Sequence, residues 1–186
     1  MQSSFQYDSG RTVQSLSPIL ERLGAAQTAF FRCADAVPRE QWATKPSAQE
    51  WSTAEVAAHL VMVERTILSG ADCITQNAPR AVPLLRRLHL PLWLVETRIV
   101  RRKTPIPLDP SLVADKEHML GELRATRERT LAFLEETRNR DLRAFRWPHP
   151  FLGMLNFYQW FEMIAAHQLR HTKQVKEISV RLLKVV

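Results

Sequence analysis

The stretch WSTAEVAAHLVMVERTILSGADCI, residues 51–74, decides the fold. Ser52 can accept a hydrogen bond from the backbone amide of Glu55 while the Glu55 side chain reaches back to Ser52, a capping box that starts a helix. After the box, apolar residues and one histidine recur every three or four positions, which places them on one helix face: Val56, His59, Leu60, Val63, Ile67, Ala71 and Ile74. The stretch therefore predicts a long amphipathic helix that begins directly after Ser52.

Three further stretches repeat this apolar pattern at helical spacing. The first is expected to begin with Ser17 as its N-cap and Pro18 in its first turn, and to stop at Pro38. The others are expected over residues 111–137 and 156–182. Hairpin signals such as Asn-Gly are absent, and no run alternates cleanly with a period of two. We therefore expect an all-α fold, an antiparallel four-helix bundle whose second helix follows Ser52.

The connection between the second and third helices is expected to be irregular. Six prolines interrupt residues 77–110, namely Pro79, Pro83, Pro91, Pro105, Pro107 and Pro110. Because proline lacks a backbone donor and clashes with the preceding turn, we expect short helices joined by turns in this segment. The prolines of WPHP, residues 147–150, likewise exclude helix just before the last member of the bundle.

The formal net charge is +7, and much of the excess lies in the same connection. Between Arg80 and Lys103, seven basic residues face one acid, Glu96. No recognised nucleic-acid module accompanies them, so we expect a solvated basic face and no nucleic-acid partner. Leucines and Trp93 beside arginines also fit contact with a membrane surface, but Pro91 breaks the amphipathic helix that such contact favours. No stable membrane association is expected.

Size and composition predict a single domain over residues 1–186. With 186 residues, 45% of them hydrophobic, the chain can close a sizeable core without disulfide bonds. Cys33 and Cys73 fall in predicted helices and are expected to be free and buried. The first ten residues, MQSSFQYDSG, lack a basic segment followed by an apolar one, and no run of about eighteen apolar residues occurs. We therefore expect a soluble, cytoplasmic protein.

The histidines carry the candidate chemistry. His167 and His171 are four residues apart, so their side chains lie one turn apart on one face of the predicted helix, and this face is the apolar one. His59 also lies on the apolar face of its helix. Buried imidazoles need partners, since an unpaired buried polar group costs about 1–3 kcal/mol. One divalent metal ion could serve all three; alternatively, each histidine bonds separately to a backbone carbonyl or an acidic side chain.

The glutamate expected of a zinc protease is missing. In HQLRH, residues 167–171, Gln168 stands where the H-E-x-x-H motif has its glutamate general base, so peptide hydrolysis of that kind is not expected. Glu55 is better explained as a capping residue than as an orienting partner of His59. Glu64 is not clearly on the same helix face as His59.

The flanks of the histidines resemble those of a known family. Residues 51–60, WSTAEVAAHL, are similar to a W-S-x-x-E-h-x-x-H-L segment, and residues 167–174, HQLRHTKQ, to an H-x-x-x-H-x-x-Q ending. The HPFLG loop at residues 149–153, Trp160, and the lead-in from VPREQW at residues 37–42 to Lys45 and Pro46 also fit. On these motifs the chain resembles the DinB superfamily of bacterial four-helix-bundle metalloproteins, which includes the YfiT-like metal-dependent hydrolases. The resemblance covers roughly residues 17–179.

This resemblance implies that His59, His167 and His171 are the ligands of a metal ion and that the bundle pairs as a homodimer. It does not extend to residues 79–110, which match no expected pattern and are a candidate for substrate selectivity. Some relatives are transferases or isomerases that use the thiols mycothiol, bacillithiol or glutathione, and many have no established activity. The resemblance therefore leaves the substrate and the catalytic residues open.

Three imidazole ligands leave at least one position of a divalent ion open, as in catalytic sites. Zinc or nickel is expected, because imidazole suits both. The first function hypothesis is a metal-dependent hydrolase or a transferase that uses a low-molecular-weight thiol. The second is a non-catalytic metal-binding homodimer that senses or stores an ion or presents an interaction surface. Arg170 and the basic connection either bind the carboxylates of a thiol cofactor or are solvated. Trp51 and Trp160 are expected to pack rather than bind substrate.

Overall fold

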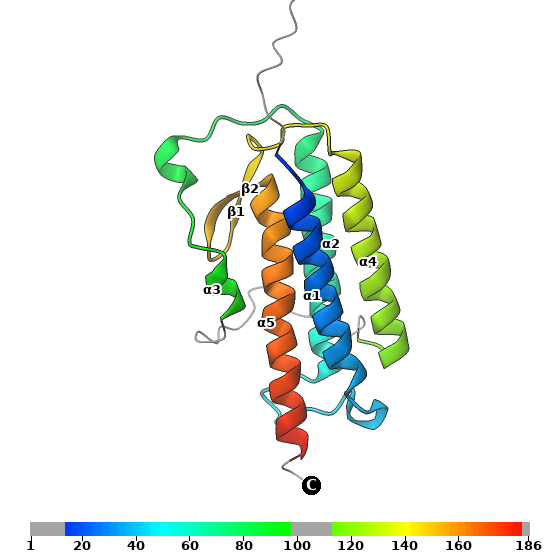
Figure 1. The fold of residues 1–186 in the computed structure, drawn as a ribbon. Helices are drawn as coiled ribbons and strands as arrows, with labels where there is room; N and C mark the ends of the chain where they lie inside the picture. The colour runs from blue at the N-terminus through cyan, green and yellow to red at the C-terminus, as the bar shows by residue number, and fades with distance from the viewer. Residues whose placement is uncertain (1–13, 98–112, 184–186) are drawn as a thin grey trace, which may run out of the picture.

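Four long helices form the body of the molecule in a computed structural model that describes residues 14–97 and 113–183 (Figure 1). They are α1 (Ser17–Asp35), α2 (Thr53–Thr75), α4 (Lys116–Glu136) and α5 (Phe157–Leu183). The predicted four-helix bundle is confirmed. None of the described helices is long and apolar enough to cross a membrane.

The helices form two parallel pairs. Along α2 and α4, Arg65 pairs with Glu122 near the middle, and Arg140, just beyond α4, donates to the carbonyl of Thr75 at the end of α2. The helices α1 and α5 also run in the same direction (Figure 1). The chain leaves α2 at one end of the bundle and enters α4 at the opposite end, so α4 runs parallel to α2. In contrast, α5 runs antiparallel to α2.

The helix starts follow local capping chemistry. The capping box of α2 is present: the Glu55 amide donates to Ser52 Oγ at 3.2 Å, and the Ser52 amide donates to Glu55 Oε2 at 2.8 Å. Asp115 caps α4 by accepting from the His118 amide at 2.9 Å, so α4 begins at Lys116, later than predicted. Ser17 is the first helical residue of α1 rather than its N-cap, which is Leu16, and no side chain caps this helix.

The proline-rich connection contains short helices, as predicted. They are a turn of 3-10 helix, η2 (Leu84–Arg87), and the single-turn helix α3 (Trp93–Glu96). A second turn of 3-10 helix, η1 (Arg39–Gln41), lies between α1 and α2. The rest of the predicted connection, residues 98–112, lies outside the described residues.

A β-hairpin precedes α5, where the sequence indicated only the absence of helix. Strands β1 (Arg146–His149) and β2 (Gly153–Asn156) pair antiparallel. Gly153 has a φ of 92°, and a Cβ built on it would lie 2.7 Å from the carbonyl oxygen of Leu88. Only glycine fits this position, because the backbone of residues 88–90 runs beside β2, with the Leu90 amide donating to the Leu152 carbonyl at 2.8 Å.

The core contains one arginine that sequence patterning assigned to a solvated helix face. Arg127 of α4 is only 1% exposed. Its Nε and Nη2 donate to the Glu64 carboxylate of α2 at 2.8 and 3.0 Å, and Nη2 also donates to Gln168 Oε1 of α5 at 2.9 Å. Its Nη1 donates to the Leu23 carbonyl of α1. One guanidinium therefore connects all four long helices.

The cysteines are free, as expected, but only one of them is partly buried. Cys33 is half-buried, and its Sγ donates weakly to the Thr172 carbonyl at 3.7 Å. Cys73 is exposed, contrary to the expectation of burial, because it lies on the outer face of α2.

Candidate metal centre

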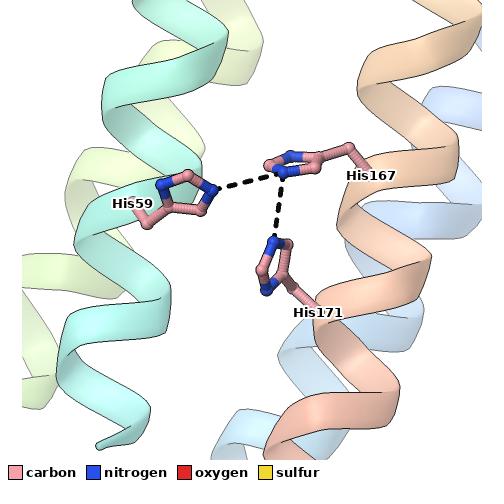
Figure 2. A group of neighbouring side chains, drawn as sticks. All are labelled: His59, His167 and His171. Atoms are coloured by element: carbon pink, nitrogen blue, oxygen red, sulfur yellow. Dashed lines mark hydrogen bonds between the residues drawn. The ribbon is translucent and has the colours of Figure 1, made fainter. Parts of the chain in front are cut away.

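Three histidines from two helices meet inside the bundle (Figure 2). His59 comes from α2, and His167 and His171 come from successive turns of α5. The Nε2 atoms of His59 and His167 are 3.3 Å apart, and those of His167 and His171 are 3.1 Å apart. His59 and His167 are separated by 108 residues of chain. The antiparallel packing of α2 against α5 thus brings together the three residues predicted from the sequence.

The rings present the same nitrogen to the centre. His171 Nδ1 lies 2.8 Å from Gln174 Oε1, an oxygen that can only accept, so the proton of this imidazole sits on Nδ1 and its Nε2 carries a lone pair. His59 Nδ1 is buried and has no hydrogen-bond partner in the part of the chain that the structure describes. The three Nε2 atoms face one another rather than a carboxylate or a backbone carbonyl.

Burial favours the neutral form of two of the imidazoles. Desolvation lowers the pKa of His59 to about 4. The pKa of His167 is lowered well below its usual value by burial first, and then by the nearby His171 and His59. Neutral imidazole is the form that binds metal ions.

The spacing of the nitrogens fits a shared ion. Imidazole nitrogens at about 2.0–2.1 Å from a tetrahedral zinc ion lie about 3.3–3.4 Å from one another. The two measured separations, 3.3 and 3.1 Å, are close to this value. Among the described residues, this trio is the one group of three or more histidine, cysteine or acidic side chains close enough together to hold a metal ion. It could therefore hold an ion through three protein ligands, leaving further positions open.

Trp51 lies against the outer side of the cluster. Its ring centroid is 5.0 Å from that of His59 and 6.4 Å from that of His171, with which it is stacked at an interplanar angle of 14°. His59 and His171 are buried, whereas His167 is partly exposed. Trp51 was expected to pack, and the rings it packs against are those of the candidate ligands.

Comparison with known proteins agrees with the sequence motifs. Residues 22–175 match the DinB superfamily. The chain is 31% identical over 139 residues to the uncharacterized protein YuaE of Bacillus subtilis (strain 168), a match that spans 74% of this chain and 83% of the relative. The chain belongs to the DinB superfamily. The resemblance stated from the motifs is thereby confirmed.

Two solved structures have the same fold as this DinB-superfamily protein. One is YfiT from Bacillus subtilis, described as a probable metal-dependent hydrolase with an unusual four-helix bundle topology (TM-score 0.63, 13% identity, 96% of this chain and 93% of that chain). The other is TT2238, described as a four-helix bundle protein (TM-score 0.57, 18% identity, 88% of this chain and 99% of that chain). At these identities the likeness shows the fold alone.

Other candidate residues have structural partners. Glu55 caps α2, as predicted, and also pairs with Lys45 at 2.7 Å. Arg170 donates to the backbone carbonyls of Val95 and Thr97, so it holds α3 against α5 instead of facing a carboxylate ligand. Trp160 packs as expected: its ring stacks on that of Trp147 at 5.1 Å, and its Nε1 donates to the Trp147 carbonyl at 3.2 Å.

Sequence reasoning gave no role to two residues close to the cluster. Gln174 accepts from His171, a pairing that the i, i+3 spacing could have indicated. Gln168, which replaces the glutamate of the protease motif, accepts from Arg127 at 2.9 Å. A neutral acceptor suits that position, because the Glu64 carboxylate already balances the charge of Arg127.

Proposed function

We propose that this DinB-superfamily protein binds one divalent transition metal ion through His59, His167 and His171 and uses its open coordination positions for catalysis. The observation that carries the proposal is the convergence of the Nε2 atoms of three histidines, with no fourth histidine, cysteine or acidic ligand beside them among the described residues. The description of YfiT, a protein of the same fold, as a probable metal-dependent hydrolase also supports it. Zinc is the first candidate and nickel the second.

When bound, such an ion supplies a Lewis acid that lowers the pKa of a bound water toward about 7 or holds a thiol as its thiolate. The substrate of the proposed enzyme is accordingly either a compound with a hydrolysable bond or an electrophile that accepts a low-molecular-weight thiol. The chain itself prepares the ligands. Gln174 holds the proton of His171 on Nδ1, so that Nε2 is free to bind. The Trp51 ring stacks on His171 and packs at a tilt against His59.

A second candidate function is a metal-binding homodimer without catalysis, and the positions of two surface cavities favour the absence of catalysis at the metal centre. One cavity lies between α1 and α4 and is lined by Phe31 and Arg124, among others. The other lies between α2 and α4, beside Arg65 and Glu122. Neither is lined by the three histidines, so neither is a substrate pocket at the metal centre.

Metal content tests the site, and turnover tests its use. Protein purified without a nickel column is expected to contain about one transition metal ion per chain by elemental analysis, and His59→Ala, His167→Ala and His171→Ala are each expected to lose it. His118→Ala, which removes an exposed histidine of α4, is the matched control and keeps the ion. Equal metal content in the ligand variants and in the control contradicts the site.

Turnover is then screened with simple esters and amides, and separately with low-molecular-weight thiols and electrophiles. A thiol-dependent rate that His59→Ala abolishes identifies a transferase, and a thiol-independent one a hydrolase. A loaded protein that is silent in both screens and dimeric by light scattering supports the non-catalytic alternative.

A further inference from the structure

The segment that follows α2 presents a cluster of exposed apolar side chains outside the bundle. Leu84 is 76% exposed, Leu85 is 85% exposed and Trp93 is 60% exposed. Figure 1 shows this part of the chain, which includes η2, reaching sideways away from the four long helices. We use the name leucine face for the exposed apolar residues of this segment, Leu84, Leu85, Leu88, Leu90 and Trp93, together with Phe151 of the adjoining hairpin turn. Clustered exposed apolar residues mark interaction surfaces more often than chance.

Hydrogen bonds hold the leucine face in place. Leu88 and Leu90 flank His89, whose ring turns inward, with Nε2 2.7 Å from Gln159 Nε2 of α5. The Met154 amide donates to the Leu88 carbonyl at 3.4 Å, which ties this stretch to β2. Because side chains alternate along an extended chain, anchoring His89 inward turns both leucines outward. Their exposure is therefore built into the fold.

The surroundings of the leucine face are basic. No aspartate or glutamate occurs in residues 76–95 or 142–161, the two stretches that contain the face and the hairpin beside it. Arg80, Arg86 and Arg87 are exposed within the first stretch. Burial, and then the nearby charge of Arg87, lower the pKa of Arg146 in the second, which shows that the two arginines are neighbours. Glu96, the first acidic residue after residues 76–95, forms an ion pair with Arg22.

We propose that the leucine face docks on the surface of an anionic lipid bilayer. Its apolar side chains enter the headgroup region, and the surrounding arginines contact lipid phosphates. Charge complementarity favours this occupant over a second copy of the chain, since a two-fold pairing through the same face would bring the basic surroundings of both copies together. The sequence disfavoured membrane contact because Pro91 breaks a helix. The structure presents the leucines on a 3-10 turn and an extended stretch, Trp93 at the start of the single-turn helix α3, and Phe151 in the hairpin turn, so no continuous helix is needed.

Vesicle sedimentation at low salt tests this proposal, which does not depend on the metal centre. The full-length protein is expected to partition at least about tenfold more strongly onto phosphatidylglycerol vesicles than onto phosphatidylcholine vesicles. The double variants Leu84→Ser with Leu85→Ser, and Arg86→Gln with Arg87→Gln, are each expected to lower that partitioning about tenfold or more. Added salt is expected to weaken binding.

Matched variants elsewhere on the surface control for general loss of apolar area or charge. Leu183→Ser removes a side chain that is 69% exposed at the far end of α5. Arg129→Gln with Arg138→Gln removes two exposed charges, one within α4 and one just after it. Both control variants are expected to bind vesicles like the wild type. Circular dichroism checks that each variant is folded. Absence of binding to phosphatidylglycerol, equal binding to both lipids, or unchanged binding of the leucine-face variants overturns the proposal. The proposal is also overturned if the wild-type protein does not bind vesicles but forms a dimer, and if the double variant Leu84→Ser with Leu85→Ser is monomeric.

Discussion

Arg127 and Glu64 form a bidentate ion pair in the centre of the bundle, with N–O distances of 2.8 and 3.0 Å and both residues at most 4% exposed. Removal of one partner leaves an uncompensated buried charge. We therefore expect Arg127→Met to lower the free energy of unfolding by about 3–5 kcal/mol. Urea denaturation measures this loss.

The double variant Arg127→Met with Glu64→Leu removes both charges and is expected to recover most of that stability. Arg129→Met, two residues away and exposed on the same helix, is the control and is expected to change stability by less than about 0.5 kcal/mol. If Arg127→Met and Arg129→Met change the free energy of unfolding by the same amount, loss of the Arg127 partner does not destabilise the fold as described.

Gln174 is expected to raise metal affinity without touching the ion. Its Oε1 accepts the proton of His171 Nδ1 at 2.8 Å, which fixes the ring with Nε2 toward the centre. Gln174→Leu is therefore expected to weaken zinc binding about 10–100-fold, measured by competition with a chelating dye. Gln174→Glu keeps an acceptor and retains affinity. Gln159→Leu, near the start of α5, serves as the control, and an unaltered zinc affinity in Gln174→Leu would rule out this role.

His149 is expected to make the metal-free protein less stable in acid. Burial lowers its pKa to about 4, and its Nδ1 accepts from the amides of Phe151 and Leu152 at 3.1 and 3.2 Å, so the folded state holds it neutral. Between pH about 6.5 and 4 the unfolded chain binds a proton that the folded chain does not, so stability falls as the pH falls through this window. The free energy of unfolding of His149→Gln is expected to fall less between pH 7 and pH 5 than that of the wild type.

Chemical denaturation at the two pH values, after removal of metal, measures the difference. His118→Gln alters an exposed histidine and is expected to keep the wild-type pH dependence. The same dependence in His149→Gln as in the wild type is the contrary outcome.

Gly153→Ala is expected to loosen the hairpin from the extended stretch beside it. Its φ of 92° is unfavourable for alanine, and the new Cβ would meet the Leu88 carbonyl at 2.7 Å. We expect a loss of about 1–3 kcal/mol and faster hydrogen exchange of the Leu90 amide. Gly121→Ala in α4, where nothing lies within 4 Å of the new Cβ, is expected to stabilise by about 0.5–1 kcal/mol. Equal effects at both glycines would contradict the close approach.

Features that depend on residues close in the sequence were predicted correctly, whereas features that depend on contacts between distant residues were not. The start of α2 and the inward histidines follow from capping and helical period, which act within a few residues. The hairpin was missed because its strands have four residues each and depend on Leu88 approaching Gly153 from a distant part of the chain. Arg127 was assigned to solvent because its partners, which include Glu64 and Gln168, are 63 and 41 residues away. Helix spacing alone also leaves helix direction unspecified.

The separation of 108 residues between His59 and His167 also orders events during synthesis. A growing chain that has left the ribosome only as far as α4 offers the proposed ion one ligand, and the other two arrive together with α5. The proposed site is therefore complete only after translation has passed His171, and until then the nascent chain cannot hold the ion through all three histidines.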